Sequence, residues 1–311
     1  MSKKLLFITD AFDSLNHKKD TSIFMMEEAS AQGFEIYQCE MESINILQKD
    51  VYADCKFVDI EKSFSVTSPS TFKLSDFSYV FMRKDPPVDT NYNNCLHLLS
   101  LAENNGARVY NNPRAIKEFN EKVFALYFSD YIPDTIITSD IEKVIDFQKK
   151  HKNIIVKPLD GMGGASIYKF DEIKEDQIEI VKKMTANSSL KIIAQEFLED
   201  IYDGDFRILI IHGNPFEIAL ARIPQGGNFK GNLAAGGKGV AMQITNKQME
   251  VASIVAKKLK DEGINFAGID MIGDRLTEIN ITSPTCAREI FNQTGKNPIK
   301  EYIQGLWAHT Y

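Results

Sequence analysis

Short apolar runs alternate with longer amphipathic stretches along most of this chain, and this alternation limits the possible fold more than any other feature. An apolar run at 4–9 precedes a helical pattern over 17–32, which ends at Gly33, and a second apolar run follows at 34–40. A third apolar run lies at 79–83. Strand–helix–strand order of this kind predicts an α/β fold with a parallel sheet.

The third run also indicates where a ligand binds. It leads directly into Lys84-Asp85-Pro86-Pro87, and ligands of open α/β sheets bind beyond the carboxyl ends of the strands. Asn111-Asn112-Pro113 then breaks the chain, and β-branched strands follow beyond it. We therefore expect an N-terminal α/β domain over 1–119 and a second domain over 120–311. The pattern over 51–66 is ambiguous, and we expect it to contain strand structure, whereas no motif assigns a role to the segment 50–69.

Charge and composition exclude several classes of protein. The 43 acidic residues outnumber the 36 basic ones, for a net charge of −7, which disfavours nucleic-acid binding along a basic face. No apolar stretch approaches the ~20 residues that span a bilayer, and Asp10 follows the first run too soon for a secretory signal. The four cysteines are scattered without a C-x-x-C pair. We expect reduced thiols in a cytoplasmic protein, without a zinc site or disulfide framework.

A first glycine cluster lies between two expected strands. It reads Lys157-Pro-Leu-Asp160-Gly161-Met162-Gly163-Gly164-Ala-Ser166. Glycine lets backbone N–H groups approach an anion closely, so this order indicates a flap over phosphate groups, with Lys157 as a fixed cation beside it. The cluster is neither a Walker A loop nor a dinucleotide fingerprint. A plain tight hairpin is the alternative.

A second glycine cluster, at 223–239, holds six of the 18 glycines and shows no apolar period. A structureless segment of this length inside a compact domain is typically a lid or a disordered linker. Its Ala-Ala centre, polar flanks and glycine hinges favour a lid that closes over substrate and excludes water.

Carboxylates follow one strand face near the C-terminus. Glu278, Asn280 and Thr282 alternate with apolar residues, so they share a face of the strand, although a half-exposed structural strand has the same pattern. Asp270 lies in the preceding buried run, and pairing of the two strands through the turn at 273–275 brings it near Glu278. Carboxylate and amide oxygens suit Mg²⁺. A simple Asp270–arginine ion pair is the alternative.

Single cations complete this pattern. Lys122, Lys157, Arg207 and Arg222 are each expected in the second domain, and any one of them alone is more often a solvated surface charge. Together with two glycine loops and a carboxylate-bearing strand, they form a set suited to phosphoryl transfer.

These motifs, taken in order, resemble those of the bacterial glutathione synthetases of the ATP-grasp superfamily. The matching segments cover nearly the whole chain: Arg83-Lys84-Asp85-Pro86-Pro87, Asn120-Glu121-Lys122, 155–166, 194–198, Asp205-Phe206-Arg207, 221–227, 231–237 and 277–285. The resemblance implies a Rossmann-like N-terminal domain followed by an ATP-grasp domain. The latter would consist of an ATP-clamping part, 120–198, and a catalytic part, 199–311, with a mobile loop at 223–238.

The resemblance also implies a role for each motif. Residues implied to bind ATP are Lys122, Lys157, Gly161, Met162, Gly163, Gly164, Gln195, Glu196, Phe197, Leu198 and Asp205. Arg207 and Arg222 are the implied catalytic residues, and Asp270, Glu278 and Asn280 the implied ligands of Mg²⁺ or Mn²⁺. The implied substrate-binding residues are Arg83, Lys84, Asp85, Asn232, Gly236, Gly237, Ser283, Pro284 and Thr285.

The implied reaction joins γ-glutamylcysteine and glycine with ATP, through an acyl phosphate, and the implied assembly is a homotetramer. Two other hypotheses stand beside it. One is an ATP-grasp ligase that uses a different acid and amine. The other is a nucleotide-binding regulator without turnover, which would lack a metal ligand or have a shortened lid, and both features are intact here.

Overall fold

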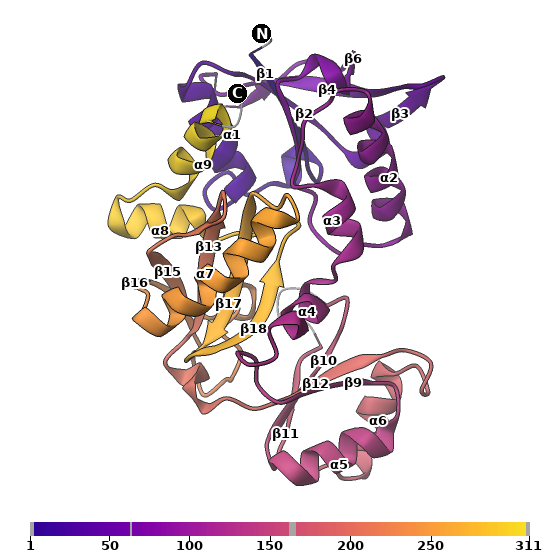
Figure 1. Ribbon diagram of the computed structural model, residues 1–311, viewed down its shortest axis with the longest axis vertical. Helices are drawn as coiled ribbons and strands as arrows, with labels where there is room; N and C mark the ends of the chain where they lie inside the picture. The colour runs from indigo at the N-terminus through magenta and orange to yellow at the C-terminus, as the bar shows by residue number, and fades with distance from the viewer. Residues whose placement is uncertain (1–2, 63, 162–165, 309–311) are drawn as a thin grey trace.

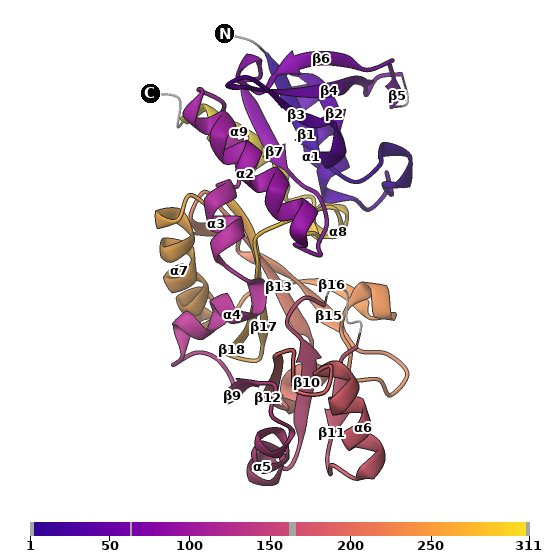
Figure 2. The same ribbon diagram turned by 90° about the vertical axis from the view of Figure 1, so that its right-hand side faces the viewer.

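Three sheets lie one above another along the long axis of the computed structural model, which describes residues 3–62, 64–161 and 166–308 (Figures 1 and 2). An eight-stranded sheet belongs to the N-terminal part, and four-stranded and six-stranded sheets to the remainder. The four-stranded sheet lies at the far end of the molecule from the N-terminus (Figure 1). The last described helix, α9 (Pro298–Ala308), packs back against the N-terminal sheet.

The N-terminal sheet has the order β3-β4-β2-β1-β7-β8, with β5 and β6 paired to β4. The four strands β2, β1, β7 and β8 run parallel to one another, which confirms the predicted parallel arrangement. Its strands are β1 (Lys4–Ile8), β2 (Glu35–Cys39), β3 (Ile44–Leu47), β4 (Asp50–Asp59), β5 (Ser65–Val66), β6 (Ser70–Lys73), β7 (Tyr79–Met82) and β8 (Val109–Tyr110). The segment 50–69 supplies the antiparallel strands β4 and β5, which confirms the strand structure expected there.

Burial on both faces explains the continuous apolar run of β1. Leu5 and Phe7 join the core under α1 (Thr21–Ala31) and α9 (Pro298–Ala308), whereas Leu6 and Ile8 join the core under α2 (Thr90–Asn104). Helix α1 begins later than the sequence pattern indicated, because the Asp20 carboxylate caps it by accepting hydrogen bonds from the backbone N–H groups of Ser22 and Ile23 at 2.6 and 3.0 Å.

The four-stranded sheet is antiparallel throughout and has the order β11-β10-β12-β9. Helices α5 (Ile141–His151) and α6 (Glu175–Met184) pack against it over a core that includes Val144, Val156 and Val181. The strands are β9 (Thr135–Thr138), β10 (Ile154–Pro158), β11 (Tyr168–Phe170) and β12 (Ile192–Glu196). This unit carries the first glycine loop between β10 and β11.

The six-stranded sheet has the order β16-β15-β13-β17-β18, with β14 paired to β13. Its strands are β13 (Asp205–Ile211), β14 (Asn214–Pro215), β15 (Ile218–Ile223), β16 (Lys238–Gln243), β17 (Phe266–Ile272) and β18 (Arg275–Asn280). Helix α7 (Asn246–Asp261) covers one face, and α8 (Ala287–Thr294) and α9 lie on the other. Successive residues of β13, such as Ile208 and Leu209, therefore enter different cores on the two faces of the sheet.

Two short helices join the N-terminal sheet to the rest of the chain. They are α3 (Pro113–Glu118) and α4 (Glu121–Phe124), and the Asn112 and Asn120 side chains cap them. Helix α4 contacts β18, so the residues just after the domain junction lie beside the carboxylate-bearing strand. Of the helices that the structure describes, none is both long and apolar enough to cross a bilayer.

Candidate active site

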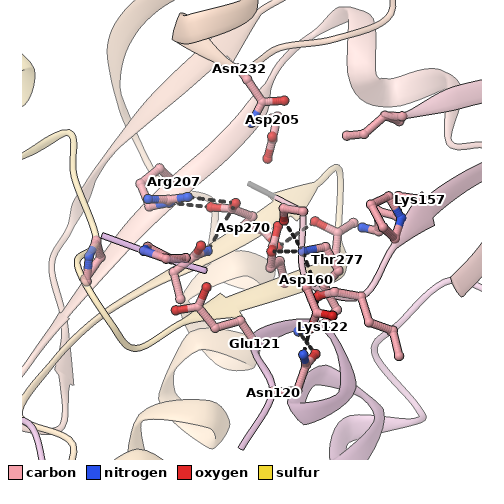
Figure 3. A pocket seen from close by; sticks show the side chains of 18 of the residues that line it. Asn120, Glu121, Lys122, Lys157, Asp160, Asp205, Arg207, Asn232, Asp270 and Thr277 are labelled. Carbon is pink, nitrogen blue, oxygen red and sulfur yellow. Dashed lines mark hydrogen bonds and ion pairs between the residues drawn. The ribbon is translucent and has the colours of Figure 1, made fainter. Parts of the chain in front are cut away.

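A pocket of ≈ 540 Å³ lies where the three sheets meet. Asp85 of the N-terminal part, Lys157 of the four-stranded sheet and Arg207 of the six-stranded sheet all line it. Figure 3 shows the Arg207 and Asp270 side chains facing one another, with Lys157 to one side and Asn120 below. Each part of the fold therefore contributes charged side chains to a single cavity.

Most of the site residues predicted from the sequence line this pocket. They are Asp85, Lys122, Lys157, Gly161, Gln195, Glu196, Phe197, Leu198, Asp205, Arg207, Arg222, Asn232, Asp270, Glu278, Asn280, Ser283, Pro284 and Thr285. Four others, Arg83, Lys84, Gly236 and Gly237, are not among its lining residues. Met162, Gly163 and Gly164 lie outside the described residues.

Arg83 and Lys84 hold the turn after β7 in place. The buried Arg83 guanidinium donates from Nε to Ser22 Oγ at 3.1 Å and from Nη2 to the carbonyl of Pro284 at 3.0 Å. Lys84 Nζ lies 2.5 Å from Asp10 Oδ1. Both cations thus have partners within the protein, and Arg83 connects the N-terminal sheet to the pocket segment at Pro284.

Asp85, the next residue of this turn, does face the pocket. Its backbone N–H donates to Asp10 Oδ2 at 3.1 Å, and its carboxylate accepts a hydrogen bond from the Ser283 hydroxyl. Burial raises the pKa of Asp85, and the Ser283 hydrogen bond only partly offsets that effect. No sequence motif pointed to a role for Asp10 at this site, although Asp10 follows shortly after the first strand, where ligand-side residues are expected.

Asp270 lies at the centre of a buried cluster of charges. In the sheet register it is opposite Arg207, while Asp205 is opposite Arg222. Asp270 Oδ2 is 2.9 Å from Nη2 of both arginines, and Oδ1 accepts from Arg207 Nε. Burial opposes ionisation, but the two guanidinium groups outweigh it and hold the pKa of Asp270 well below its usual range. The Asp270–arginine ion pair that the sequence offered as an alternative to metal binding is thus present, and it involves two arginines.

Glu278 faces Asp270 across the β17–β18 ladder, as the predicted hairpin requires. Its Oε1 lies 3.2 Å from Lys122 Nζ, and Lys122 also donates to the carbonyls of Gly161 at 2.5 Å and Leu159 at 3.3 Å. Lys122 therefore ties the start of the glycine loop to β18. Burial lowers the pKa of the nearby Lys157, although the charge on Glu278 opposes this shift.

The donor types at this site fit a divalent cation. Asp270 and Glu278 supply carboxylate oxygens, and Asn280 donates from Nδ2 to Asp270 Oδ2 at 3.3 Å and to the Gly268 carbonyl at 3.2 Å, which leaves its amide oxygen for a ligand. Within the described part of the chain, no three acidic, histidine or cysteine side chains form a ready-made metal cluster. Here the third donor is an amide, and arginine and lysine side chains hold the two carboxylates.

The second glycine cluster lies over the pocket. Phe229, Asn232 and Leu233 line it, and the Phe229 ring meets the Phe197 ring edge-on with centroids 6.5 Å apart. The segment ends in β16, which pairs with β15. Gly237 approaches the Gly231 carbonyl so closely that a Cβ at 237 would overlap with it. The packing requires glycine there, although Gly237 does not itself line the pocket.

Glu121 belongs to the Asn120-Glu121-Lys122 motif, from which no role for its own side chain was predicted, yet it lines the pocket beside β18. Its carboxylate accepts hydrogen bonds from the backbone just after Asn280. Burial, reinforced by the charge on Glu278, raises the pKa of Glu121. The sequence predicted the short helix that carries Glu121. A helical pattern does not show which distant segment the Glu121 side chain contacts.

Solved structures with the same arrangement define the class of protein. The chain superposes over 97% of its length on D-cycloserine synthetase DcsG, with a TM-score of 0.67, 13% identity and 98% of that chain covered. ATP-grasp ligase PsnB, bound to a minimal precursor, matches with a TM-score of 0.66 at 18% identity over the full length of both chains. These similarities, together with the pocket of lysines, arginines and carboxylates, define an ATP-grasp fold.

Sequence comparison then gives the family. The model of the prokaryotic glutathione synthetase N-terminal domain matches residues 3–117, and that of the prokaryotic glutathione synthetase ATP-grasp domain matches residues 121–295. Glutathione synthetase of Vibrio parahaemolyticus is 43% identical, and that of Escherichia coli O127:H6 is 40% identical, each over 92% of both chains. The chain belongs to the prokaryotic glutathione synthetase family. The predicted family, fold and ligase activity are confirmed, and membership implies use of ATP and a divalent cation.

Proposed function

We propose that this chain joins γ-glutamylcysteine and glycine to form glutathione, converting ATP to ADP and phosphate. The observation that carries the proposal is the single pocket in which a glycine loop, two lysines, two arginines and the Asp270–Glu278 pair meet. Relatives named glutathione synthetase at 40–43% identity support the choice of substrates. Within this proposal each part of the pocket has a separate task.

The side of the pocket formed by the four-stranded sheet would hold ATP. Lys122 and Lys157 both line the pocket, and Lys122 Nζ contacts the start of the glycine loop at the Gly161 carbonyl, so both cations would meet the phosphates there. The segment 195–198 would border the adenine, where the Gln195 amide is oriented by donation to Thr135 Oγ1 at 3.1 Å. Asp205 would lie at the edge of this site and keep Arg222 in place. We propose that Met162, Gly163 and Gly164 complete the phosphate flap.

Asp270, Glu278 and Asn280 would hold Mg²⁺, with Mn²⁺ as a substitute, through hard oxygen donors. A bound divalent cation neutralises charge on the phosphate oxygens. The protein's own cations already stand beside these ligands: Lys122 contacts Glu278, and Arg207 and Arg222 contact Asp270. When ATP binds, Lys122 would exchange Glu278 for a phosphate oxygen, so that the same lysine serves the empty and the filled site.

The chemistry follows from these positions. A carboxylate oxygen of γ-glutamylcysteine attacks the γ-phosphorus, the bond to ADP breaks, and an acyl phosphate forms. The glycine amine then attacks the acyl carbon, phosphate leaves, and the amine loses a proton. Arg207 and Arg222 would stabilise the negative charge on the phosphoryl oxygens in both steps. Asp85, Asn232, Ser283, Pro284 and Thr285 would line the substrate side. We propose that Arg83, Lys84, Gly236 and Gly237 support that side from outside the pocket.

The lid over 223–238 has a chemical purpose in this scheme, because water hydrolyses an acyl phosphate. Its contact between Phe229 and Phe197 would join the lid to the ATP side. Exclusion of water then depends on the close glycine packing at Gly231 and Gly237.

The test measures ADP release and product mass with the purified protein. We expect glutathione only when ATP, Mg²⁺, γ-glutamylcysteine and glycine are all present, with omission of glycine as the control. Activity only with another acid or amine would favour the alternative ligase. ATP binding without turnover on any pair would favour a regulatory protein.

We also propose the division into 1–119, 120–198 and 199–311, a homotetrameric assembly and a cytoplasmic location. The three separate sheets support the division. Sedimentation equilibrium at several protein concentrations measures the assembly, and a single species of another mass would contradict the tetramer.

A further inference from the structure

Strand β18 ends at Asn280, immediately before the segment that enters the substrate side of the pocket. The last pair of its ladder joins Asn280 to Gly268. Ile281 and Thr282 follow, and after them come Ser283, Pro284 and Thr285, which line the pocket. This short segment therefore connects a proposed metal ligand to the proposed substrate site, and its orientation sets the spacing between them.

On one side, Glu121 holds this segment. A single carboxylate oxygen, Oε1, accepts hydrogen bonds from the backbone N–H of Ile281 at 2.7 Å, the N–H of Thr282 at 3.0 Å and the Thr282 hydroxyl at 2.9 Å. A carboxylate that accepts several backbone N–H bonds makes charge-assisted hydrogen bonds, which are stronger than neutral ones. Glu121 is the first residue of α4, so the short helix delivers this oxygen to β18.

On the other side, Asn111 holds the same segment. Its side-chain Nδ2 donates to the carbonyls of Ile281 at 2.8 Å and Phe266 at 2.7 Å. Its Oδ1 accepts from the backbone N–H groups of Asn265 at 2.9 Å and Phe266 at 3.0 Å. The Asn111 amide is buried and bonded through both of its polar atoms.

The peptide unit between Ile281 and Thr282 is thus held at its oxygen by Asn111 and at its N–H by Glu121. We propose that Glu121, supported by Asn111, is a positioning residue that sets the orientation of 280–285 and so aligns Asn280 with the substrate residues Ser283 and Thr285. The two side chains do for this peptide what a neighbouring strand does within a sheet. The inference rests on the proposed function only for its effect on catalysis.

Two substitutions at Glu121 separate positioning from charge. Glu121→Gln keeps a side-chain oxygen acceptor of the same length, whereas Glu121→Ala removes the acceptor. Glu142→Ala is the matched control, because Glu142 is exposed and also lies in the first turn of a helix capped by an Asx residue. Thr282→Val removes only the hydroxyl donor and provides a second test if Glu121→Ala does not fold.

Amide hydrogen exchange is measured first, on the full chain without ATP or metal. In Glu121→Ala we expect exchange at Ile281 and Thr282 to be at least about tenfold faster, with unchanged exchange at 275–279, because the acceptor is lost locally. This readout requires no substrate, so it stands even if the proposed reaction is wrong. Unchanged exchange at both amides would overturn the proposal.

Kinetics form the second arm, with whichever substrate pair the protein uses. For Glu121→Ala we expect kcat to fall by about 10–100-fold, as for other residues that orient ligands, with a higher Mg²⁺ concentration at half-maximal rate and a KM for ATP within about twofold. Glu121→Gln should recover activity to within about threefold, Thr282→Val should lose about two- to threefold, and Glu142→Ala should match the wild type. If Glu121→Gln is as slow as Glu121→Ala, the charge rather than the position matters and the proposal fails.

Discussion

Replacement of Asp270 by Asn removes one negative charge from a buried site and changes the side-chain shape little. Arg207 Nη2 and Arg222 Nη2 each lie 2.9 Å from the Asp270 carboxylate, and the three side chains are at most 7% exposed. Arg222 keeps Asp205 as a partner, but Arg207 has no second carboxylate contact among the ion pairs of the described residues. The variant therefore leaves one buried guanidinium without charge compensation.

The magnitude follows from these distances. At an effective dielectric constant of ~20, each 2.9 Å contact has a Coulomb energy of about 6 kcal/mol, and the desolvation of three buried ions offsets much of the total. Loss of one partner from a buried ion pair typically costs ~3–5 kcal/mol. Because Asp205 still compensates Arg222, we expect a loss near the lower end, about 3 kcal/mol, in the free energy of unfolding at pH 7.

Urea unfolding followed by circular dichroism, in the presence of EDTA, measures this loss without a contribution from bound metal. The pKa of Asp270 is lower in the folded than in the unfolded protein, so its stabilisation is complete above the unfolded value near pH 4 and declines as the pH falls below it. The difference between wild type and Asp270→Asn should therefore shrink on acidification. A difference below about 1 kcal/mol at pH 7, or one that is constant with pH, would refute this reasoning.

Two further predictions concern catalysis. Glu278→Ala should reduce ligase turnover at least ~100-fold at ordinary Mg²⁺, and near-normal ligation would contradict the metal assignment. We expect this variant to lower the free energy of unfolding by less than Asp270→Asn, by about 1–2 kcal/mol, because Glu278 is 22% exposed and the buried Lys122 keeps the Gly161 and Leu159 carbonyls as partners. Gly237→Ala, in which the new Cβ meets the Gly231 carbonyl, should keep ATP binding but release phosphate without forming product, as should proteolytic cleavage within 223–238. Fully coupled ligation after either change would argue against the lid.

The N-terminal half shows how far local patterns predict the fold. The apolar run near the start of the chain predicted a buried strand, and in β1 Leu5 and Leu6 enter cores on opposite faces of the sheet. The segment 50–69 indicated strand structure but not its place in the sheet, because β4 pairs antiparallel with β2, an earlier strand. Its partner depends on long-range pairing, which a local window of sequence does not contain.

Strand β18 shows the same difference between what local sequence predicts and what long-range packing decides. Alternation placed Glu278 and Asn280 on one face, and the turn at 273–275 placed Asp270 opposite Glu278. Both inferences needed only residues close in sequence. Which cation each carboxylate contacts was not predictable, because Lys122 and Arg207 reach them from distant segments.

The sequence by itself determined the family, the class of reaction and a set of site residues most of which line the pocket, because short motifs carry the backbone geometry and donor types that the chemistry needs. Only the tertiary structure decided what those side chains contact. It directed Arg83 to the Pro284 carbonyl instead of the pocket, and it brought Glu121 to the backbone of Thr282. Such contacts join residues 160–201 positions apart, and they form only when α4 and the turn after β7 pack against the end of β18.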